Sequence, residues 1–416
     1  MTMMRKLHLS VGVLALSSGM ATAQEVEVLH WWTSGGEAAA VGTLRDTLAE
    51  GGITWQDMPV AGGGGSDAMT VLRARVTAGN PPTAVQMLGF SIQDWAAEGA
   101  LANLDDLAAE QGWGDVVPEA LQAFSTYDGS WVAAPVNVHS TNWVWANTAV
   151  MADLGLEQPE SWDDFVAAMQ AAQDAGLTAL AHGGQAWQDA TMFDSMVMGV
   201  GGPEFYQASM VDLDPDALGS DTMVEVFQRM ETLRGFVDDN FSGRDWNLAT
   251  AMVINGDALF QIMGDWAKGE FVAAGMTAGE EFTCFRVPGT EGTVTFNSDQ
   301  FAMFNVSDAS AQEAQMAMAS AVLSPEFQVT FNLVKGSVPA RTDIDSSDFD
   351  MCGQMGMAQL AEAAEAGGLF GSMAHGHANT PSVQNAMYDV ITAHFNGEFD
   401  AETAAAEMVT AVELAQ

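Results

Sequence analysis

Three β-type runs alternate with two helical runs near the start of the chain, and this order constrains the fold more than any other feature. The β-type runs cover residues 25–32, 53–60 and 83–88, and the helical runs cover 41–50 and 66–78, with Ser66 as the expected cap of the second helix. Strands that alternate with helices are joined by crossover connections, which make them parallel. The chain is therefore predicted to be an α/β protein with a parallel sheet near its N-terminus.

The rest of the chain predicts a second lobe. Its 416 residues are too many for one hydrophobic core, so two domains are expected. A β-rich stretch at 128–147, interrupted by Pro135, is interpreted as the first crossing between them. Ser161 caps a predicted helix at 158–176. The remaining predicted elements are strands at 177–182 and 259–263 and helices at 221–238, 309–323 and 325–334.

The first 23 residues have the features of a secretory signal peptide. Arg5 and Lys6 form a positive start, residues 9–16 are mostly apolar, and small residues at 21–23 precede the expected cleavage point. The apolar stretch is shorter than the roughly 20 residues that a membrane span needs. We therefore expect an exported protein in the periplasm, without direct membrane insertion.

The chain is strongly acidic. Its formal charge is −43, and loss of the two positive charges at Arg5 and Lys6 would bring it to −45. Such a chain is repelled by nucleic acid and by anionic lipid, so neither is an expected partner. Acidic residues are spread along the sequence, which is typical of a solvated surface in a salty medium. After residue 23 only two lysines remain, Lys268 and Lys335.

The two cysteines, Cys284 and Cys352, are an even count in an exported chain, which favours a disulfide. Closing a loop of that length would stabilise the fold by about 4 kcal/mol on the chain-entropy model. Two free, buried thiols are the alternative.

Common catalytic and metal-binding motifs are absent from the sequence. It has no zinc-type cluster of Cys and His, no G-x-S-x-G and no P-loop. The glycines at 62–65 precede a helix and could hold an anion, but a plain strand-to-helix connection is commoner. Met373, His375 and His377 suggest copper only weakly, because the 27 methionines are scattered as core residues would be. No cofactor, metal or catalytic residue is expected.

Tryptophans next to polar groups recur in four places, HWWTSGGE, WQDATMFD, GRDWN and MGDWAKGE, and FNSDQF is a related polar segment without a tryptophan. A pyranose has a C–H face that packs on an indole and hydroxyls that must be paired when buried. A sugar site therefore needs flat aromatic rings with charged and amide groups around them. Trp31, Trp32, Trp246 and Trp266 stand beside several polar groups in turn-like settings. The tryptophans expected in the core or at its edge are Trp95, Trp131, Trp143, Trp145 and Trp162.

At these residues the sequence resembles the periplasmic sugar-binding proteins of ABC transporters, and more narrowly the glucose/mannose-binding members of extracellular solute-binding protein family 1. The resemblance runs through LHWWTSGGEAAA, GNPPTAVQ, PVNVHSTNWVW, GRDWNLATAMVINGDALFQIMGDWAKGEF and VKGSVPARTD. It implies two α/β lobes joined by a hinge, with the ligand in the cleft between them. Lobe one would comprise 24–134 and 292–342, and lobe two 135–291 and 343–416.

The resemblance also implies a set of ligand-binding residues. These are Trp31, Trp32, Glu37, Gln86, Trp246, Trp266, Asp299, Lys335 and His375. His139 and Asn137 lie near the expected hinge and are further candidates to approach the site. The second histidine of HGHANT, His377, departs from the family pattern, and Lys268 matches no ligand contact, so a surface or lobe-interface role is expected for it. A disulfide between Cys284 and Cys352 is consistent with related proteins.

The expected function is capture without chemistry. A monosaccharide, glucose or mannose, would bridge both lobes, favour the closed form and be delivered by a monomeric protein to a membrane permease. A disaccharide or polyol could bind to the same set of residues. Two other classes stay open: a secreted glycoside hydrolase with Glu37 and Asp299 as its carboxylates, and a metal-binding protein built on His375 and His377.

Overall fold

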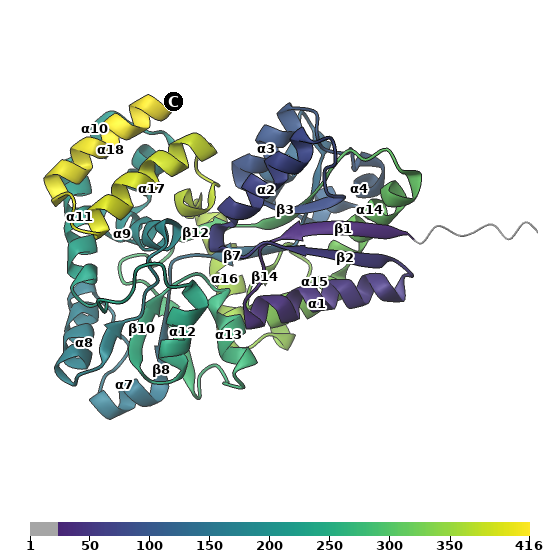
Figure 1. Cartoon of the computed structure of the whole chain (residues 1–416). Helices are drawn as coiled ribbons and strands as arrows, with labels where there is room; N and C mark the ends of the chain where they lie inside the picture. The colour runs from purple at the N-terminus through teal and green to yellow at the C-terminus, as the bar shows by residue number, and fades with distance from the viewer. Residues whose placement is uncertain (1–23) are drawn as a thin grey trace, which may run out of the picture.

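Two α/β lobes face each other in the computed structural model, which describes residues 24–416 (Figure 1). Each lobe has its own sheet, and a third, smaller sheet lies between them. The predicted α/β class is confirmed. The predicted signal peptide, residues 1–23, lies outside the described residues.

The sheet of the first lobe contains the predicted parallel unit. Its strand order is β2 (Thr54–Pro59), β1 (Glu25–His30), β3 (Ala84–Leu88), β13 (Asp299–Met303) and β6 (Ala133–Pro135). Strand β1 runs parallel to β2 and β3, and β13 returns antiparallel to β3 and β6. The carboxyl ends of β1 and β3 and the start of β13 therefore meet at one edge of this sheet.

Helices cover this sheet, and two helix starts differ from the prediction. Helix α1 (Gly35–Glu50) begins six residues earlier than expected, because Ser34 and Glu37 form a capping box. Helix α2 (Ser66–Thr77) does not use Ser66 as its cap: Gly65 occupies that position with a φ of +80°, and Ser66 is the first helical residue. The other helices of this lobe are α3 (Gly89–Ala97), α4 (Asp105–Gln111), α5 (Trp113–Val116), α6 (Glu119–Ser125), α14 (Ala309–Val322) and α15 (Pro325–Lys335).

The second lobe is built on a mixed four-stranded sheet. Its order is β11 (Phe282–Arg286), β8 (Trp143–Asn147), β10 (Ala258–Ile262) and β9 (Thr178–Leu180). Its helices are α7 (Thr148–Leu154), α8 (Trp162–Asp174), α9 (Ala186–Tyr206), α10 (Pro215–Leu218), α11 (Asp221–Arg234), α12 (Trp246–Ile254), α13 (Ala267–Ala273), α16 (Met351–Ala366), α17 (Pro381–Phe395) and α18 (Ala401–Ala415). Ser161 caps α8 as predicted, since its side chain accepts from the backbone N–H of Asp164.

The third sheet joins the segments that pass between the lobes. Its order is β14 (Val338–Pro339), β7 (Asn137–Ser140), β12 (Val294–Asn297) and β15 (Leu369–Gly371). Strands β7, β12 and β14 fall beside the predicted crossings at 135, 292 and 343, whereas β15 does not. The lobe boundaries themselves stay a prediction.

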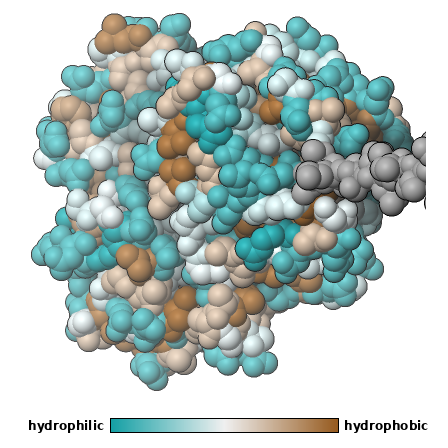
Figure 2. All heavy atoms as spheres, turned by 45° about the vertical axis from the view of Figure 1, so that its right-hand side comes forward, coloured by the Kyte–Doolittle hydropathy of each residue, from teal (hydrophilic) through white to brown (hydrophobic). Residues whose placement is uncertain are grey.

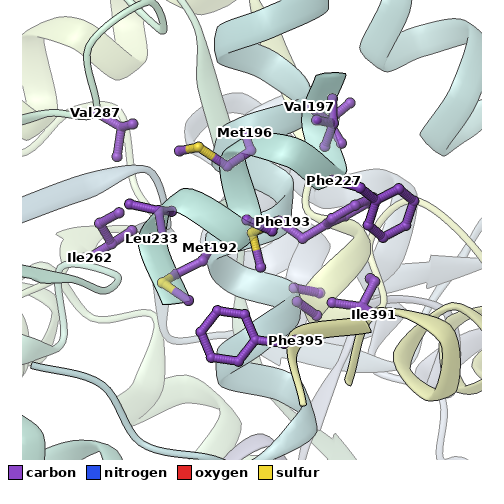
Figure 3. Close-up of a cluster of buried hydrophobic side chains, with 14 of the residues drawn as sticks. Met192, Phe193, Met196, Val197, Phe227, Leu233, Ile262, Val287, Ile391 and Phe395 are labelled. Carbon is purple, nitrogen blue, oxygen red and sulfur yellow. The ribbon is translucent and has the colours of Figure 1, made fainter. Parts of the chain in front are cut away.

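Methionines fill much of the second lobe's core, as their scatter in the sequence predicts. In Figure 3, Met192 and Met196 of α9 lie among Phe227 and Leu233 of α11 and Phe395 of α17. All five side chains are almost fully buried. This packing places α9 and α17 firmly beneath the turn that carries His375.

The disulfide and the lysine expectations have different outcomes. Cys284 of β11 is bonded to Cys352 of α16, so the disulfide is present and ties α16 to the second lobe's sheet. Lys268 is not a surface residue: it is 1% exposed, and its ammonium donates to Asp350 at 3.1 Å. The expected core tryptophans Trp143 and Trp145 are buried, whereas the other three are half-buried.

Hydrophilic residues cover most of the face drawn in Figure 2, with hydrophobic residues in small separate groups. Within residues 24–416, no helix has both the length and the apolar character needed to cross a bilayer.

Candidate ligand-binding site

A cavity lies between the lobes. Both lobes and the connecting strands contribute to its wall. The lining residues are Trp31, Trp32, Glu37, Gly63, Gly64, Leu88, His139, Trp187, Trp246, Trp266, Asn297, Asp299, Lys335 and His375.

The first lobe's wall begins where β1 ends and α1 starts. Trp31 and Trp32 follow β1 and turn to opposite sides, one into each of two core clusters. Glu37 sits at the third position of α1, where one carboxylate oxygen accepts from the N–H groups of Thr33 and Ser34. Its other oxygen accepts from the ammonium of Lys335 at 3.2 Å. The helix cap thus fixes a buried ion pair on the cavity wall.

Asp299 is the most heavily hydrogen-bonded carboxylate of the site. It accepts from Gln86 at 2.7 Å on one oxygen, and from Asn137 and His139, both at 3.0 Å, on the other. Burial alone would raise the pKa of Asp299, but the hydrogen bond and charge of His139, with the charge of Lys335, lower it to about 2. Asp299 is therefore a fixed anion that accepts hydrogen bonds.

His139 lies on the strand β7 between the lobes and contacts a carboxylate from each. Its Nε2 faces Asp299 of the first lobe, and its Nδ1 bonds to Asp265, which precedes α13 in the second. Burial alone would lower the pKa of His139, but the charge and hydrogen bond of Asp265 raise it. A protonated His139 donates to both carboxylates and so links the two lobes beneath the cavity.

Three indoles form the second lobe's wall. Trp246 is the first residue of α12 and Trp266 immediately precedes α13, so both stand at helix starts rather than in plain turns. Trp187, at the start of α9, lies with its ring centre 6.2 Å from that of Trp266. Gly264 allows Trp266 to fold back, since a Cβ there would lie 2.1 Å from the indole.

The glycine loop before α2 meets this wall from the other lobe. A Cβ on Gly63 would lie 2.6 Å from the indole of Trp187, and one on Gly65 would lie 2.9 Å from that of Trp31. The loop is thus a strand-to-helix connection in which Gly63 leaves room for Trp187 of the other lobe, and Gly65 leaves room for Trp31 of the same lobe.

His375 and His377, in the turn after β15, occupy different positions relative to the cavity. His375 lines the cavity with its ring centre 5.2 Å from that of Trp266. His377 lies behind it, donating to the carbonyl of His375 from Nδ1 and accepting from the N–H of Ser298 at Nε2. Burial is the main cause that lowers the pKa of His375 to about 3 and of His377 to about 4. Both rings are neutral.

The two lobes touch directly at the start of α1. The N–H of Gly36 donates to Glu270 of α13 at 2.8 Å. A Cβ on Gly36 would lie 2.8 Å from the carbonyl carbon of Gly269, and one on Gly269 would lie 3.0 Å from the carbonyl oxygen of Lys335. We call Gly36, Gly269 and Glu270 the seam. It explains why residue 36 is a glycine and describes a closed arrangement of the lobes.

Eight of the nine predicted site residues line the cavity. The exception is Gln86, which is fully buried behind the wall, where it accepts from the N–H of Trp31 and donates to Asp299. Of the two hinge candidates, His139 lines the cavity and Asn137 supports Asp299 from behind. That any of these side chains binds a ligand stays a prediction.

Sequence reasoning missed Trp187, Asn297, Leu88 and the glycines at 63 and 64 as lining residues. Trp187 and Asn297 lie in WQDATMFD and FNSDQF, two of the five quoted segments, so the polar surroundings of each were a usable signal. Leu88 carried none.

Metal binding finds no support at His375 and His377. Over residues 24–416, no group of three or more His, Cys, Asp or Glu side chains is arranged to hold a metal ion.

Two lobes, a connecting sheet and a walled cavity between them define the class of two-lobed solute-binding proteins. Solved structures agree with the predicted fold. A bacterial solute receptor described as preferring β-D-galactopyranose superposes with a TM-score of 0.80 at 18% identity, covering 94% of this chain and 98% of that one. A chitin oligosaccharide binding protein gives a TM-score of 0.79 at 20% identity, with the same coverage of both chains.

More narrowly, the chain belongs to the bacterial extracellular solute-binding protein family, whose model matches residues 47–329. A protein from Rhizobium meliloti named as a probable sugar-binding periplasmic protein is 60% identical over 416 residues, covering 99% of this chain and all of that protein. A protein of the same name from Mesorhizobium japonicum is 54% identical over 415 residues, covering 99% of both. The family consists of binding proteins rather than enzymes.

Proposed function

We propose that this chain is the periplasmic sugar-binding component of an ABC importer and that it captures a single monosaccharide, glucose or else mannose. The observation that carries the proposal is the wall of the cavity: Trp31 on one lobe faces indoles on the other, with charged side chains between them. Indoles suit the C–H faces of a pyranose, and the anion Asp299 suits its hydroxyls. The relatives named as sugar-binding periplasmic proteins support the ligand class.

The closeness of the two lobes supports one ring rather than two. Trp187 meets Gly63 across the opening, so a second ring would require the lobes to part. A disaccharide or polyol is the alternative that a ligand screen tests.

Capture would work through closure of the lobes. The ligand touches both lobes only in the closed form, so it stabilises that form relative to the open one. The loaded protein then docks as a monomer on a membrane permease, which recognises the closed arrangement.

Hydrolysis is a poorer fit to the same residues. A glycosidase needs one carboxylic acid with a raised pKa beside a second carboxylate. The pKa of Asp299 is instead lowered to about 2. Glu37 is held by a helix cap and by Lys335.

Isothermal titration with D-glucose, D-mannose, D-galactose, D-xylose, maltose and sorbitol tests the proposal. We expect one hexose to bind most tightly, and Trp31→Ala to weaken it by about 30-fold, as loss of a central aromatic contact does. Trp162→Phe is the matched control, since Trp162 packs under Arg229 away from the cavity. Absence of binding to every sugar, or tighter binding of maltose than of any hexose, would contradict the proposal.

A further inference from the structure

Two polar atoms on the cavity wall have no hydrogen-bond partner: Nε2 of His375 and Oδ1 of Asn297. Both residues are at least 95% buried. An unpaired buried polar atom costs about 1–3 kcal/mol, so a ligand that pairs with it recovers that cost. The other unpaired atoms among residues 24–416 belong to side chains that do not line the cavity.

These two atoms differ in what they can offer. Asn297 carries an amide, which donates through its nitrogen and accepts through its oxygen, and a rotation of its side chain exchanges the two. His375 is a neutral imidazole, so its Nε2 either donates or accepts, depending on which nitrogen carries the proton. The partner of Nδ1 decides this.

A chain of three side chains sets the proton of His375. Where Asp194 is ionised, Ser372 donates its one hydroxyl proton to it at 2.6 Å, since a carboxylate can only accept. The oxygen of Ser372 must then accept from Nδ1 of His375, which lies 2.8 Å away. Nδ1 therefore carries the proton, and Nε2 is left as an unpaired acceptor on a side chain that lines the cavity.

The remaining contacts of Asp194 hold it as the acceptor at the base of this chain. Asp194 lies on α9 in the core of the second lobe and is fully buried. The N–H of Ala374 donates to it at 3.1 Å, and the hydroxyl of Tyr206 donates at 3.1 Å. Burial raises the pKa of Asp194 to about 7, and the hydrogen bonds from Ser372 and Ala374 oppose that rise.

We propose that Asp194 and Ser372 form a positioning relay that fixes His375 in the Nδ1–H tautomer, so that its Nε2 accepts a hydrogen bond from one ligand hydroxyl and selects for a donor at that place. The inference rests on the proposed function, because it takes the ligand to be a sugar with free hydroxyls. A ligand with only an acceptor there, such as a fluorine or a methyl ether, leaves Nε2 unpaired.

Nuclear magnetic resonance of protein labelled with ¹⁵N-histidine tests the relay without any ligand. Because burial raises the pKa of Asp194 to about 7, the spectrum is recorded above that pH, where Asp194 is ionised, and we expect Nε2 of His375 to resonate as an unprotonated ring nitrogen. In Asp194→Asn the amide oxygen would take the place of the oxygen that accepts from both Ser372 and Ala374, and the amide nitrogen would face Tyr206, so we expect His375 to keep its Nδ1–H tautomer. His377 is the internal control, because its partners are the carbonyl of His375 and the N–H of Ser298.

A second variant breaks the relay, which Asp194→Asn leaves connected. Ser372→Ala removes the link between Asp194 and His375, and we expect it to lose the pure Nδ1–H signature while His377 keeps its own. A protonated Nε2 in the wild-type protein, or an unchanged signature in Ser372→Ala, would overturn the relay.

Titration with D-glucose and its monodeoxy and monodeoxyfluoro derivatives tests the selectivity. At the carbon that faces His375, we expect the deoxyfluoro and deoxy sugars to lose affinity alike, by tenfold or more, because neither can donate. His375→Ala should remove that loss at this position only. A loss pattern that His375→Ala leaves unchanged would refute the selectivity. If wild-type protein binds none of the sugars, the proposed function fails while the resonance result still decides the relay.

Discussion

The seam between the lobes allows a prediction about closure that does not involve the ligand. In Gly36→Ala the new Cβ would lie 2.8 Å from the carbonyl carbon of Gly269 and 2.9 Å from a carboxylate oxygen of Glu270. Carbon atoms pack best at about 3.5–4.0 Å, so the helices must move apart. The φ of Gly36 is not positive, so alanine suits α1 itself.

The expected magnitude follows from that clash. Overpacking of a close contact costs about 1–3 kcal/mol, and this cost is confined to the closed form. A penalty of that size on closure weakens ligand binding by about 5- to 150-fold. The first lobe should not lose stability, because alanine is a better helix former than glycine.

Isothermal titration with two sugars of different affinity measures the effect. The loss should be the same factor for both, because the seam lines no part of the cavity. Gly35→Ala is the matched control: it changes the neighbouring residue of the same helix, and its Cβ would lie 3.7 Å from Glu270, an ordinary contact. Unchanged affinity in Gly36→Ala, or a loss confined to one sugar, would refute the reasoning.

Three other predictions concern the carboxylate, the disulfide and the indole that sequence reasoning missed. The pKa of Asp299 falls from an ordinary 3.8 to about 2 on folding, so its ionised form stabilises the protein by about 2 kcal/mol above pH 4, and this stabilisation is lost as the pH falls from 4 toward 2. In urea unfolding, Asp299→Asn should therefore have a lower free energy of unfolding than the wild-type protein, by a difference that shrinks over that pH range. A difference that stays constant with pH would contradict this prediction. Replacing Cys284 and Cys352 together by serine should lower the free energy of unfolding by about 4 kcal/mol, since the bond closes a loop across a sequence separation of 68, and should leave sugar affinity unchanged; a large loss of affinity would instead tie the disulfide to closure. Trp187→Ala should weaken binding by about 30-fold in titration, and an unchanged affinity would place its indole outside the ligand contacts.

Much of the fold was readable from local pattern. The alternation of strands and helices over residues 25–88 predicted the parallel unit of β1, β2 and β3, which the structure contains. Ser161 was identified as a cap because capping depends on residues within one turn. The cap at Ser66 was wrong for a related reason: the glycine before it can adopt a positive φ that the pattern of side chains does not reveal.

The residues of the candidate site could be predicted where the resemblance matched whole segments. The role of a side chain was harder to predict where it depends on residues that are distant in sequence. Gln86 was predicted as a direct partner of the sugar but supports Asp299 from behind the wall. Lys268 was expected at the surface or between the lobes; it is not at the surface, because its ammonium is buried against Asp350, but it does lie where the lobes meet, beside Gly336. Both outcomes depend on side chains that are 213 and 82 residues away in sequence.

The sequence by itself determined the type and order of the elements, the acidic surface and the two cysteines, because these follow from composition and from contacts within a few residues. Tertiary structure alone decided which indoles face the cavity, why Gly36 must lack a side chain, and which nitrogen of His375 carries the proton. The seam joins residues 234 positions apart and the ion pair of Glu37 and Lys335 joins residues 298 apart. Hydrogen bonds and steric limits act over a few ångströms in space, and only the folded chain brings such residues that close.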